Sequence, residues 1–176
     1  MTFVVPGDEP IQIQGSPHLE RLKPYGDITL YADGPPTHQE KMRRVRDAGV
    51  IINTRDPVTW PGEDLRALPK LRMIATCSIG TDNIDVKTAS ELGIIVSNQP
   101  GRTAKVVAEH MFGLMFASAR RAAYFTAEMK AGRWPRIDLI MLQKKVLGIV
   151  GTGNIGAEMA RLGRAIGMDV IAWTYH

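Results

Sequence analysis

The sequence predicts an α/β protein in which strands of parallel sheets alternate with helices. Three observations predict this class. Short apolar runs alternate with helical patterns through residues 1–100, a long helical pattern follows residue 101, and a glycine-rich turn joins a strand to a helix near residue 151. The change of pattern near residue 100 divides the chain into a first domain over 1–100 and a second domain over 101–176.

Strands and helices alternate in a regular order in the first domain. The expected strands cover residues 3–5, 28–31, 50–52, 71–76 and 94–96. The expected helices cover residues 16–25, 37–48, 61–68 and 86–92. Thr37 and Asp85 are suitable N-caps, and Gly49 and Gly93 are suitable C-terminal stops. This order favours a parallel, doubly wound sheet of the flavodoxin type.

The second domain opens with a helical pattern from about Thr103 to Arg133, in which apolar residues recur at spacings of three, four and seven. A continuous helix of this length would exceed about 40 Å, at about 1.5 Å per residue. A short crossover between strands needs far less. We therefore expect this helix to link two domains or to pack against a second subunit, as the interface of a homodimer.

The glycine-rich turn follows an apolar strand over 146–150 and precedes a helix expected over 157–166 and a second strand over 170–173. Its pattern is Gly-x-Gly-x-x-Gly. Gly151 permits a tight turn, Gly153 lets the backbone approach a pyrophosphate, and Gly156 allows close packing of helix on strand. The amides at the start of the helix would then face the phosphates.

This pattern predicts the first βαβ unit of a Rossmann domain with a bound dinucleotide. The expected cofactor residues in the turn are Gly151, Gly153, Asn154, Ile155 and Gly156. A tight turn that binds no ligand is the alternative.

Composition and charge restrict the partners. The net charge is +4, but the basic residues stand in short groups without interleaved aromatic residues, which indicates solvated helix faces rather than a nucleic-acid surface. The apolar helical segment over 111–119 is too short to span a membrane. The N-terminus lacks the features of a signal peptide, and the single Cys77 fits a reducing compartment. We expect a cytoplasmic protein without a nucleic-acid partner, membrane partner or metal site.

A second candidate site lies in the loop Ser78-Ile79-Gly80-Thr81-Asp82-Asn83-Ile84-Asp85. This loop follows the carboxyl end of a strand, where open α/β sheets bind their ligands. A glycine-containing loop there can offer backbone amides to a small carboxylate. Asn53 and Arg55 end the preceding strand and would line the same cleft. Arg55 could supply a second cation for the carboxylate or could form a surface salt bridge.

Three segments together resemble the D-isomer-specific 2-hydroxyacid dehydrogenases. They are the loop 78–85, the run 93–98 followed by Val107-Ala108-Glu109-His110, and the glycine turn. The resemblance implies a flavodoxin-like substrate domain, a Rossmann cofactor domain and an active site in the cleft between them. It also implies hydride transfer between NAD or NADP and a small 2-oxo acid.

The resemblance further implies individual roles. Ser78, Ile79 and Gly80 would bind the substrate carboxylate. Thr103 and Val107 would lie against the nicotinamide ring and the reacting carbon, although Val107 could equally be a core residue. We expect Glu109 and His110 to be structural rather than an acid–base pair, because adjacent helical residues point in different directions.

The chain departs from the family pattern at two points. Thr174 occupies the position where an acidic residue would bind the adenosine ribose, so NADP is admissible as well as NAD. The family's catalytic Arg, Glu and His all fall beyond His176, and no residue of 1–176 matches them. We therefore expect an N-terminal portion of a D-2-hydroxyacid dehydrogenase that has no meaningful turnover alone. The alternative is a non-catalytic binding protein that keeps the fold and the dimer helix.

Overall fold

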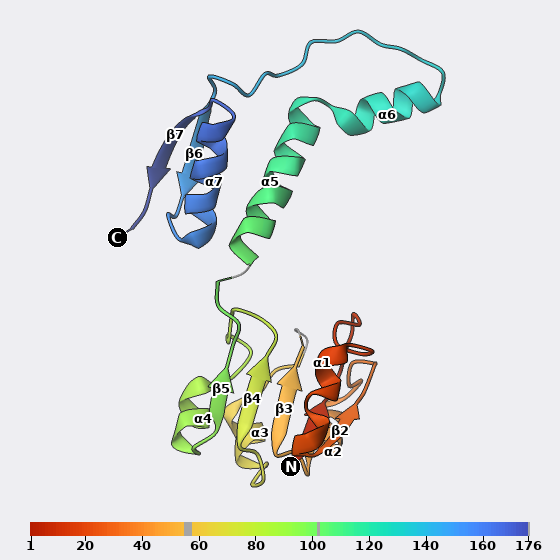
Figure 1. Ribbon diagram of the computed structural model, residues 1–176, viewed down its shortest axis with the longest axis vertical. Coiled ribbons are helices and arrows are strands. Elements are labelled where there is room, and N and C mark those ends of the chain that lie inside the picture. The colour runs from red at the N-terminus through yellow and green to blue at the C-terminus, as the bar shows by residue number, and fades with distance from the viewer. Residues whose placement is uncertain (55–57, 102, 176) are drawn as a thin grey trace. The chain divides into compact units, whose positions relative to one another are not determined.

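The computed structural model describes residues 1–54, 58–101 and 103–175. The chain forms two compact units, Met1–Pro100 and Gly101–His176. Both are α/β units with parallel strands (Figure 1), which confirms the predicted fold class.

The first unit is a five-stranded parallel sheet with the strand order β2-β1-β3-β4-β5. Its strands are β1 (Thr2–Val5), β2 (Asp27–Leu30), β3 (Val50–Asn53), β4 (Met73–Thr76) and β5 (Ile95–Ser97). This is the flavodoxin-like order, in which the chain reverses direction across the sheet between β1 and β3. The carboxyl ends of all five strands therefore meet at one edge, and the loops that follow them lie together.

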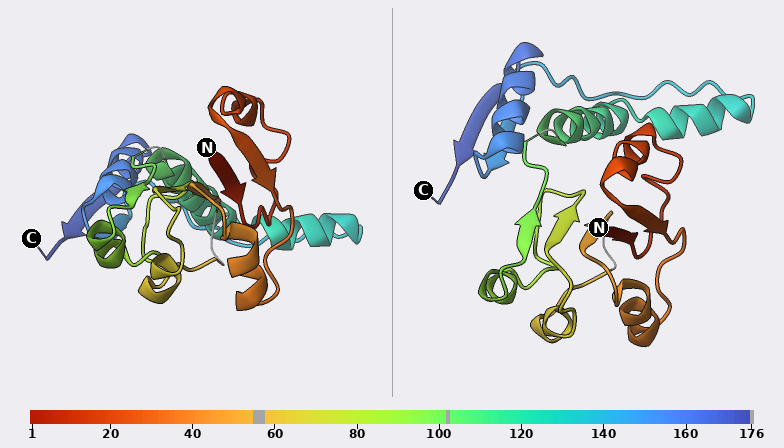
Figure 2. Two further views of the ribbon diagram at one scale, coloured as in Figure 1. Left: turned by 90° about the horizontal axis from the view of Figure 1, so that it is seen from below. Right: turned by 60° about the horizontal axis from the view of Figure 1, so that its bottom comes forward.

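Helices cover the two faces of this sheet unequally. Figure 2 shows α2 (His38–Val45), α3 (Gly62–Arg66) and α4 (Val86–Glu91) on one face and α1 (Pro17–Glu20) on the other. The main core lies between the sheet and α2–α4, because Val45, Leu65 and Ala89 of these helices pack in one buried cluster with Ile51 and Ile74 of the strands.

The predicted caps are confirmed. The Thr37 hydroxyl accepts the Glu40 amide at 3.1 Å, and the Asp85 carboxylate accepts the Thr88 amide at 2.9 Å. The helix expected over 16–25 is wrong in its length, because the structure has the single turn of α1 and then a 3-10 turn, η1 (Lys23–Tyr25). Pro24 explains the interruption, since proline lacks the amide that a continuing helix requires.

The long helix of the second unit is also shorter than expected. It ends as α5 (Thr103–Ala119), and a separate helix, α6 (Ala122–Lys130), follows. Arg121 between them has a left-handed backbone with φ of 48°, which no α-helix continues through. The Ala119 carbonyl accepts the amide of Ile140 at 3.1 Å, so the returning chain occupies an acceptor at the end of α5. At 17 residues, α5 is about 25 Å long.

The second unit continues with a βαβ element, made of β6 (Val146–Val150), α7 (Asn154–Ala165) and β7 (Asp169–Trp173). The two strands are parallel, as predicted. Helix α7 begins three residues before the expected residue 157, directly after the glycine turn. Ala108 and Phe112 of α5 form one buried cluster with Ile149 of β6 and Met159 of α7. Among the described residues, no helix is both long and apolar enough to cross a membrane.

Candidate functional site

The glycine turn has the backbone that its sequence predicts. Gly151 has φ of +93°, in the left-handed region that favours glycine. A Cβ atom on Gly156 would lie 2.0 Å from the Gly151 carbonyl oxygen, so only glycine fits where α7 crosses the turn. A Cβ atom on Gly153 would meet nothing within 4 Å. Gly151 and Gly156 therefore build the turn, whereas Gly153 leaves bare backbone at its surface.

Helix α7 starts from this bare backbone. Gly153 is its N-cap and supplies no side-chain hydrogen bond. The Gly153 carbonyl accepts the Ala157 amide at 2.9 Å, and the amides of the first helical turn have no partner within a helix. These amides belong to Asn154, Ile155 and Gly156. Together with the positive end of the helix dipole they form the kind of arrangement that binds phosphate at the N-termini of helices in other proteins.

The remaining cofactor residues of the sequence prediction lie at the same end of this unit. The Gly151 amide donates to the Trp173 carbonyl at 2.7 Å, which places Thr174 directly beside the glycine turn. Figure 1 shows the first turns of α5 and α7 at one end of the unit. Thr103 is exposed there and Val107 is half-buried, next to the fully buried Ala108. Residues 151–156 and 174 thus lie side by side, and α5, which begins with Thr103, packs against β6 and α7 through Ala108 and Phe112.

In the first unit, the loop after β4 is held through its carbonyl oxygens. The Ser78 carbonyl accepts the Gln99 amide at 3.0 Å, and the Ile79 carbonyl accepts the Asn98 side-chain amide at 2.7 Å. The Gly80 carbonyl accepts the Ser78 hydroxyl at 2.8 Å. In a trans peptide the N–H points opposite to the preceding C=O. The amides of Ile79, Gly80 and Thr81 consequently point away from these bonds and can be offered to an anion.

Two residues of this arrangement were not found from the sequence. Asn98 fastens the loop from the end of the neighbouring strand, and the Thr76 hydroxyl shares a hydrogen bond with Ser78 at 2.8 Å. Asn98 directly follows β5, so its position at the same edge of the sheet could have identified it from the sequence. The sequence did not indicate the direction of the Thr81 amide either, because the direction of a peptide cannot be inferred from residue type.

Asn53 has a different environment from the one expected of an open cleft. Its side chain is only 1% exposed, and its carboxamide oxygen accepts the Trp60 indole N–H at 3.2 Å. In the part of the chain that the structure describes, its side-chain nitrogen is buried without a hydrogen-bond partner. The Asn53 carbonyl also accepts the Cys77 amide at 2.9 Å. Asn53 therefore supports the residue that precedes the loop 78–85 from within the core, and Arg55 lies outside the described residues.

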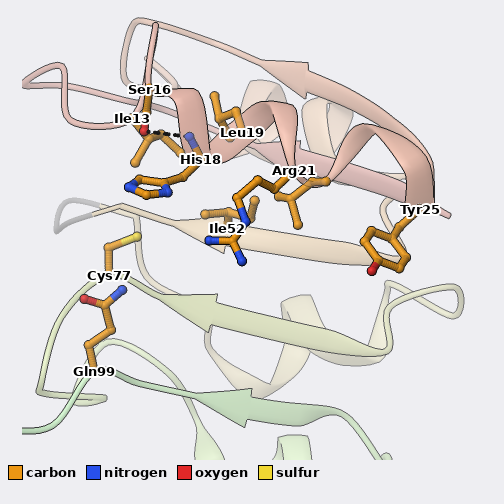
Figure 3. Close-up of a pocket in the computed structure, with 10 residues that line it drawn as sticks. Ile13, Ser16, His18, Leu19, Arg21, Tyr25, Ile52, Cys77 and Gln99 are labelled. Carbon is orange, nitrogen blue, oxygen red and sulfur yellow. Dashed lines mark hydrogen bonds between the residues drawn. The ribbon is translucent and has the colours of Figure 1, made fainter.

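A cavity of about 530 Å³ opens on the sheet face opposite α2–α4. Figure 3 shows His18, Arg21 and Cys77 directed into it. Its lining is Ile13, Ser16, His18, Leu19, Arg21, Leu22, Tyr25, Ile52, Cys77 and Gln99. Burial, together with the nearby charge of Asp8, raises the pKa of the Cys77 thiol, so this thiol is protonated at neutral pH and is a poor nucleophile.

Charged groups also join helices α2 and α3 of the first unit. Asp64 of α3 is buried and receives hydrogen bonds from Lys41 and His38 of α2, the latter at 2.7 Å. Burial raises the pKa of Asp64, but these two hydrogen bonds outweigh it and hold the pKa below its ordinary value. Among the described residues, no group of His, Cys, Asp and Glu is arranged to hold a metal ion.

The comparison with known families agrees with this geometry. The family model described as "D-isomer specific 2-hydroxyacid dehydrogenase, catalytic domain" matches residues 9–162. The chain belongs to this family. The resemblance inferred from the loop 78–85, the start of α5 and the glycine turn is therefore confirmed.

Individual relatives support the same assignment. The chain is 35% identical over 161 residues to a glyoxylate reductase of Korarchaeum cryptofilum, covering 87% of this chain and 48% of the relative. It is 40% identical over 136 residues to a hydroxypyruvate reductase of Thermotoga maritima, covering 76% and 44%. An acyclic imino acid reductase solved in complex with NADPH and D-Arg is similar with a TM-score of 0.83 at 26% identity, covering 98% and 55%. The chain thus spans about half the length of these relatives.

Proposed function

We propose that this chain is the N-terminal portion of an enzyme that transfers hydride between NAD or NADP and a small 2-oxo or 2-hydroxy acid. The observation that carries the proposal is the glycine turn, because its backbone and bare Gly153 surface fit a pyrophosphate in a chain of this family. The names of the relatives, a glyoxylate reductase and a hydroxypyruvate reductase, support a small 2-oxo acid as substrate. The NADPH in the solved imino acid reductase supports a nicotinamide cofactor.

Each unit would bind one reactant. When bound, the nicotinamide supplies the hydride. The amides of the first turn of α7 would hold the pyrophosphate, and Thr103 and Val107 would border the nicotinamide. In the first unit, the amides of Ile79, Gly80 and Thr81 would hold the substrate carboxylate through charge-assisted hydrogen bonds. Asn98 would keep these amides oriented, and Arg55 would add a positive charge.

Proton transfer is the step that this chain would not perform. On the family pattern, the Arg that orients the acid and the Glu–His pair that moves the proton fall beyond His176. Loss of general acid–base catalysis alone lowers a rate by about 10²–10⁴-fold. We therefore expect no meaningful turnover of a 2-oxo acid by residues 1–176, and appreciable oxidation of NADH or NADPH by the pure chain would contradict this.

We also propose a homodimer formed through α5 and α6. The buried face of α5 packs on β6 and α7, but its other face exposes Val106 and Leu114, and α6 exposes Tyr124 and Met129. Apolar side chains in such a row favour a protein partner. Size-exclusion chromatography with light scattering should give twice the calculated mass of 19.4 kDa; a monomer at micromolar concentration would contradict the dimer.

The alternative is a non-catalytic binding protein with the same fold. It would use an exposed apolar face: Val150 is 82% and Ile171 62% exposed on the face of β6 and β7 that no described residue covers. Such a face requires a partner or further chain. The two proposals differ in dinucleotide binding. Under the enzyme proposal the chain binds NAD or NADP, and Gly153→Val removes that binding by filling the backbone surface, whereas the alternative requires neither result.

A further inference from the structure

The loop after β4 is joined to the core by two hydroxyl groups in series. The Thr76 and Ser78 hydroxyl oxygens lie 2.8 Å apart, and the Ser78 hydroxyl donates to the Gly80 carbonyl at 2.8 Å. In a strand, side chains two residues apart point to the same side, and Thr76 and Ser78 keep this relation at the end of β4. Cys77 points instead into the cavity on the opposite face of the sheet (Figure 3). We call the series Thr76–Ser78–Gly80 the hydroxyl relay.

The direction of the bonds in the hydroxyl relay follows from the number of hydrogens. A hydroxyl group carries one hydrogen and two lone pairs. The Ser78 hydrogen is used on the Gly80 carbonyl, so Thr76 must donate to Ser78. Thr76 is only 3% exposed, and among the described residues its hydroxyl is hydrogen-bonded to Ser78 alone. Because a buried hydroxyl without a partner is costly, Thr76 holds the Ser78 hydroxyl in one orientation.

Each hydrogen bond to a loop carbonyl orients a different amide. The Gly80 carbonyl and the Thr81 amide belong to one peptide, in which C=O and N–H point in opposite directions. The Ser78 hydroxyl therefore orients the Thr81 amide, whereas Asn98 orients the Gly80 amide through the Ile79 carbonyl. Since its one hydrogen is engaged in this way, the Ser78 hydroxyl does not donate to an anion. Ser78 would serve the carboxylate indirectly, by holding a peptide.

We propose that Thr76 is a positioning residue for the substrate carboxylate and acts from the core through Ser78. Its hydroxyl fixes the Ser78 hydroxyl, which fixes the Gly80 peptide with the Thr81 amide turned outward. An amide that is already held in this orientation loses less freedom when it binds an anion. The hydroxyl relay thus raises the affinity for a carboxylate although Thr76 does not touch it. This proposal rests on the carboxylate site of the proposed function and adds the buried residue that controls it.

The test uses the ¹⁵N-labelled 176-residue chain with oxalate as the ligand. Thr76→Val keeps the shape of the side chain and removes its hydroxyl. It should weaken oxalate binding by about threefold to fivefold, a usual contribution of one hydrogen bond. It should also speed hydrogen exchange of the Thr81 amide more than that of the Gly80 amide. Thr76→Ser keeps the hydroxyl and should return both quantities to within about twofold of the parent chain.

A double-mutant cycle separates the hydroxyl relay from a general loss of stability. Ser78→Ala removes the bond to the Gly80 carbonyl itself. If Thr76 acts through Ser78, Thr76→Val should cause no further loss of oxalate affinity in a chain that already carries Ser78→Ala. Losses that multiply in the double variant would show two independent effects and would overturn the proposal.

Thr54→Val is the matched control. Thr54 is also buried, at 1% exposed, but its hydroxyl donates to the Gly7 carbonyl at 2.8 Å. The same substitution there should leave hydrogen exchange of the Thr81 amide within about twofold of the parent chain. Equal acceleration in Thr54→Val and Thr76→Val, or unchanged oxalate affinity in Thr76→Val, would overturn the positioning role while the carboxylate site stands. A parent chain that binds no oxalate would overturn the carboxylate site as well.

Discussion

The packing of α7 against the glycine turn can be tested by adding a single methyl group. Gly156→Ala places a Cβ atom 2.0 Å from the Gly151 carbonyl oxygen and 3.2 Å from a methyl carbon of Ile149. The first contact is with backbone, so no side-chain rotation relieves it. Helix α7 must move away from the turn or the turn must change its conformation. Both movements disturb the amides that would hold the pyrophosphate.

The size of the effect follows from two opposing contributions. Replacing glycine by alanine within a helix stabilises it by about 1 kcal/mol. Overpacking against a fixed neighbour costs about 1–3 kcal/mol, and more where backbone must shift. We expect Gly156→Ala to lower the free energy of unfolding of the second unit by about 1–2 kcal/mol. The free energy of dinucleotide binding should weaken by more than the free energy of unfolding falls.

Gly113→Ala supplies the matched control. Gly113 lies inside α5 of the same unit, and a Cβ atom there meets nothing within 4 Å. The same substitution should therefore stabilise by up to about 1 kcal/mol and leave dinucleotide binding unchanged. Urea unfolding, monitored by hydrogen exchange of peptides from residues 146–175, would measure the free energy of unfolding of both variants. Equal stabilities of the two variants would refute the close contact between α7 and the turn.

Three further predictions concern the other parts of the site. Gly153→Val should abolish NAD⁺ and NADP⁺ binding in an NMR titration with little loss of stability, since its Cβ position is open; retained binding would contradict the pyrophosphate site. Asn98→Ala should release the Ile79 carbonyl and lower the affinity for a small carboxylate such as oxalate by about 5–10-fold. It should also speed hydrogen exchange of residues 78–81, and unchanged exchange would contradict the claim that Asn98 holds this loop in place. The folded-state pKa of Asp64 lies below its ordinary value of 3.8, so its contribution to stability is present above that value and is lost as pH falls through the lowered pKa; Asp64→Asn should flatten the loss of stability in acid unfolding, and a parallel curve would contradict this.

The strand and helix order of both units could be predicted because it depends on local signals. Apolar runs, the caps at Thr37 and Asp85 and the three glycines of the turn act over a few residues, and the structure reproduces each of them. The break after Ala119 was not predictable in this way. The apolar spacing continues through Arg121, and the bond from the Ile140 amide that accompanies the break comes from a distant part of the chain.

The candidate site, like the fold, could be predicted only where local sequence signals mark it. The sequence identified the loop at Ser78 and the position of Thr174, because both follow strands that can be recognised. It did not show that Asn98 fastens the loop or that the Asn53 side chain is buried against Trp60. Both facts depend on which way a peptide or side chain points, and residue type alone does not determine that direction.

The central claim is that this chain holds a dinucleotide on the glycine turn and a small carboxylate on the loop after β4. Its most direct test is a two-ligand titration of the ¹⁵N-labelled chain. We predict that NADP⁺ shifts the amide resonances of residues 151–156 and 174, and that oxalate shifts those of residues 79–81. No shifts, or shifts confined to residues outside these two segments, would contradict the account.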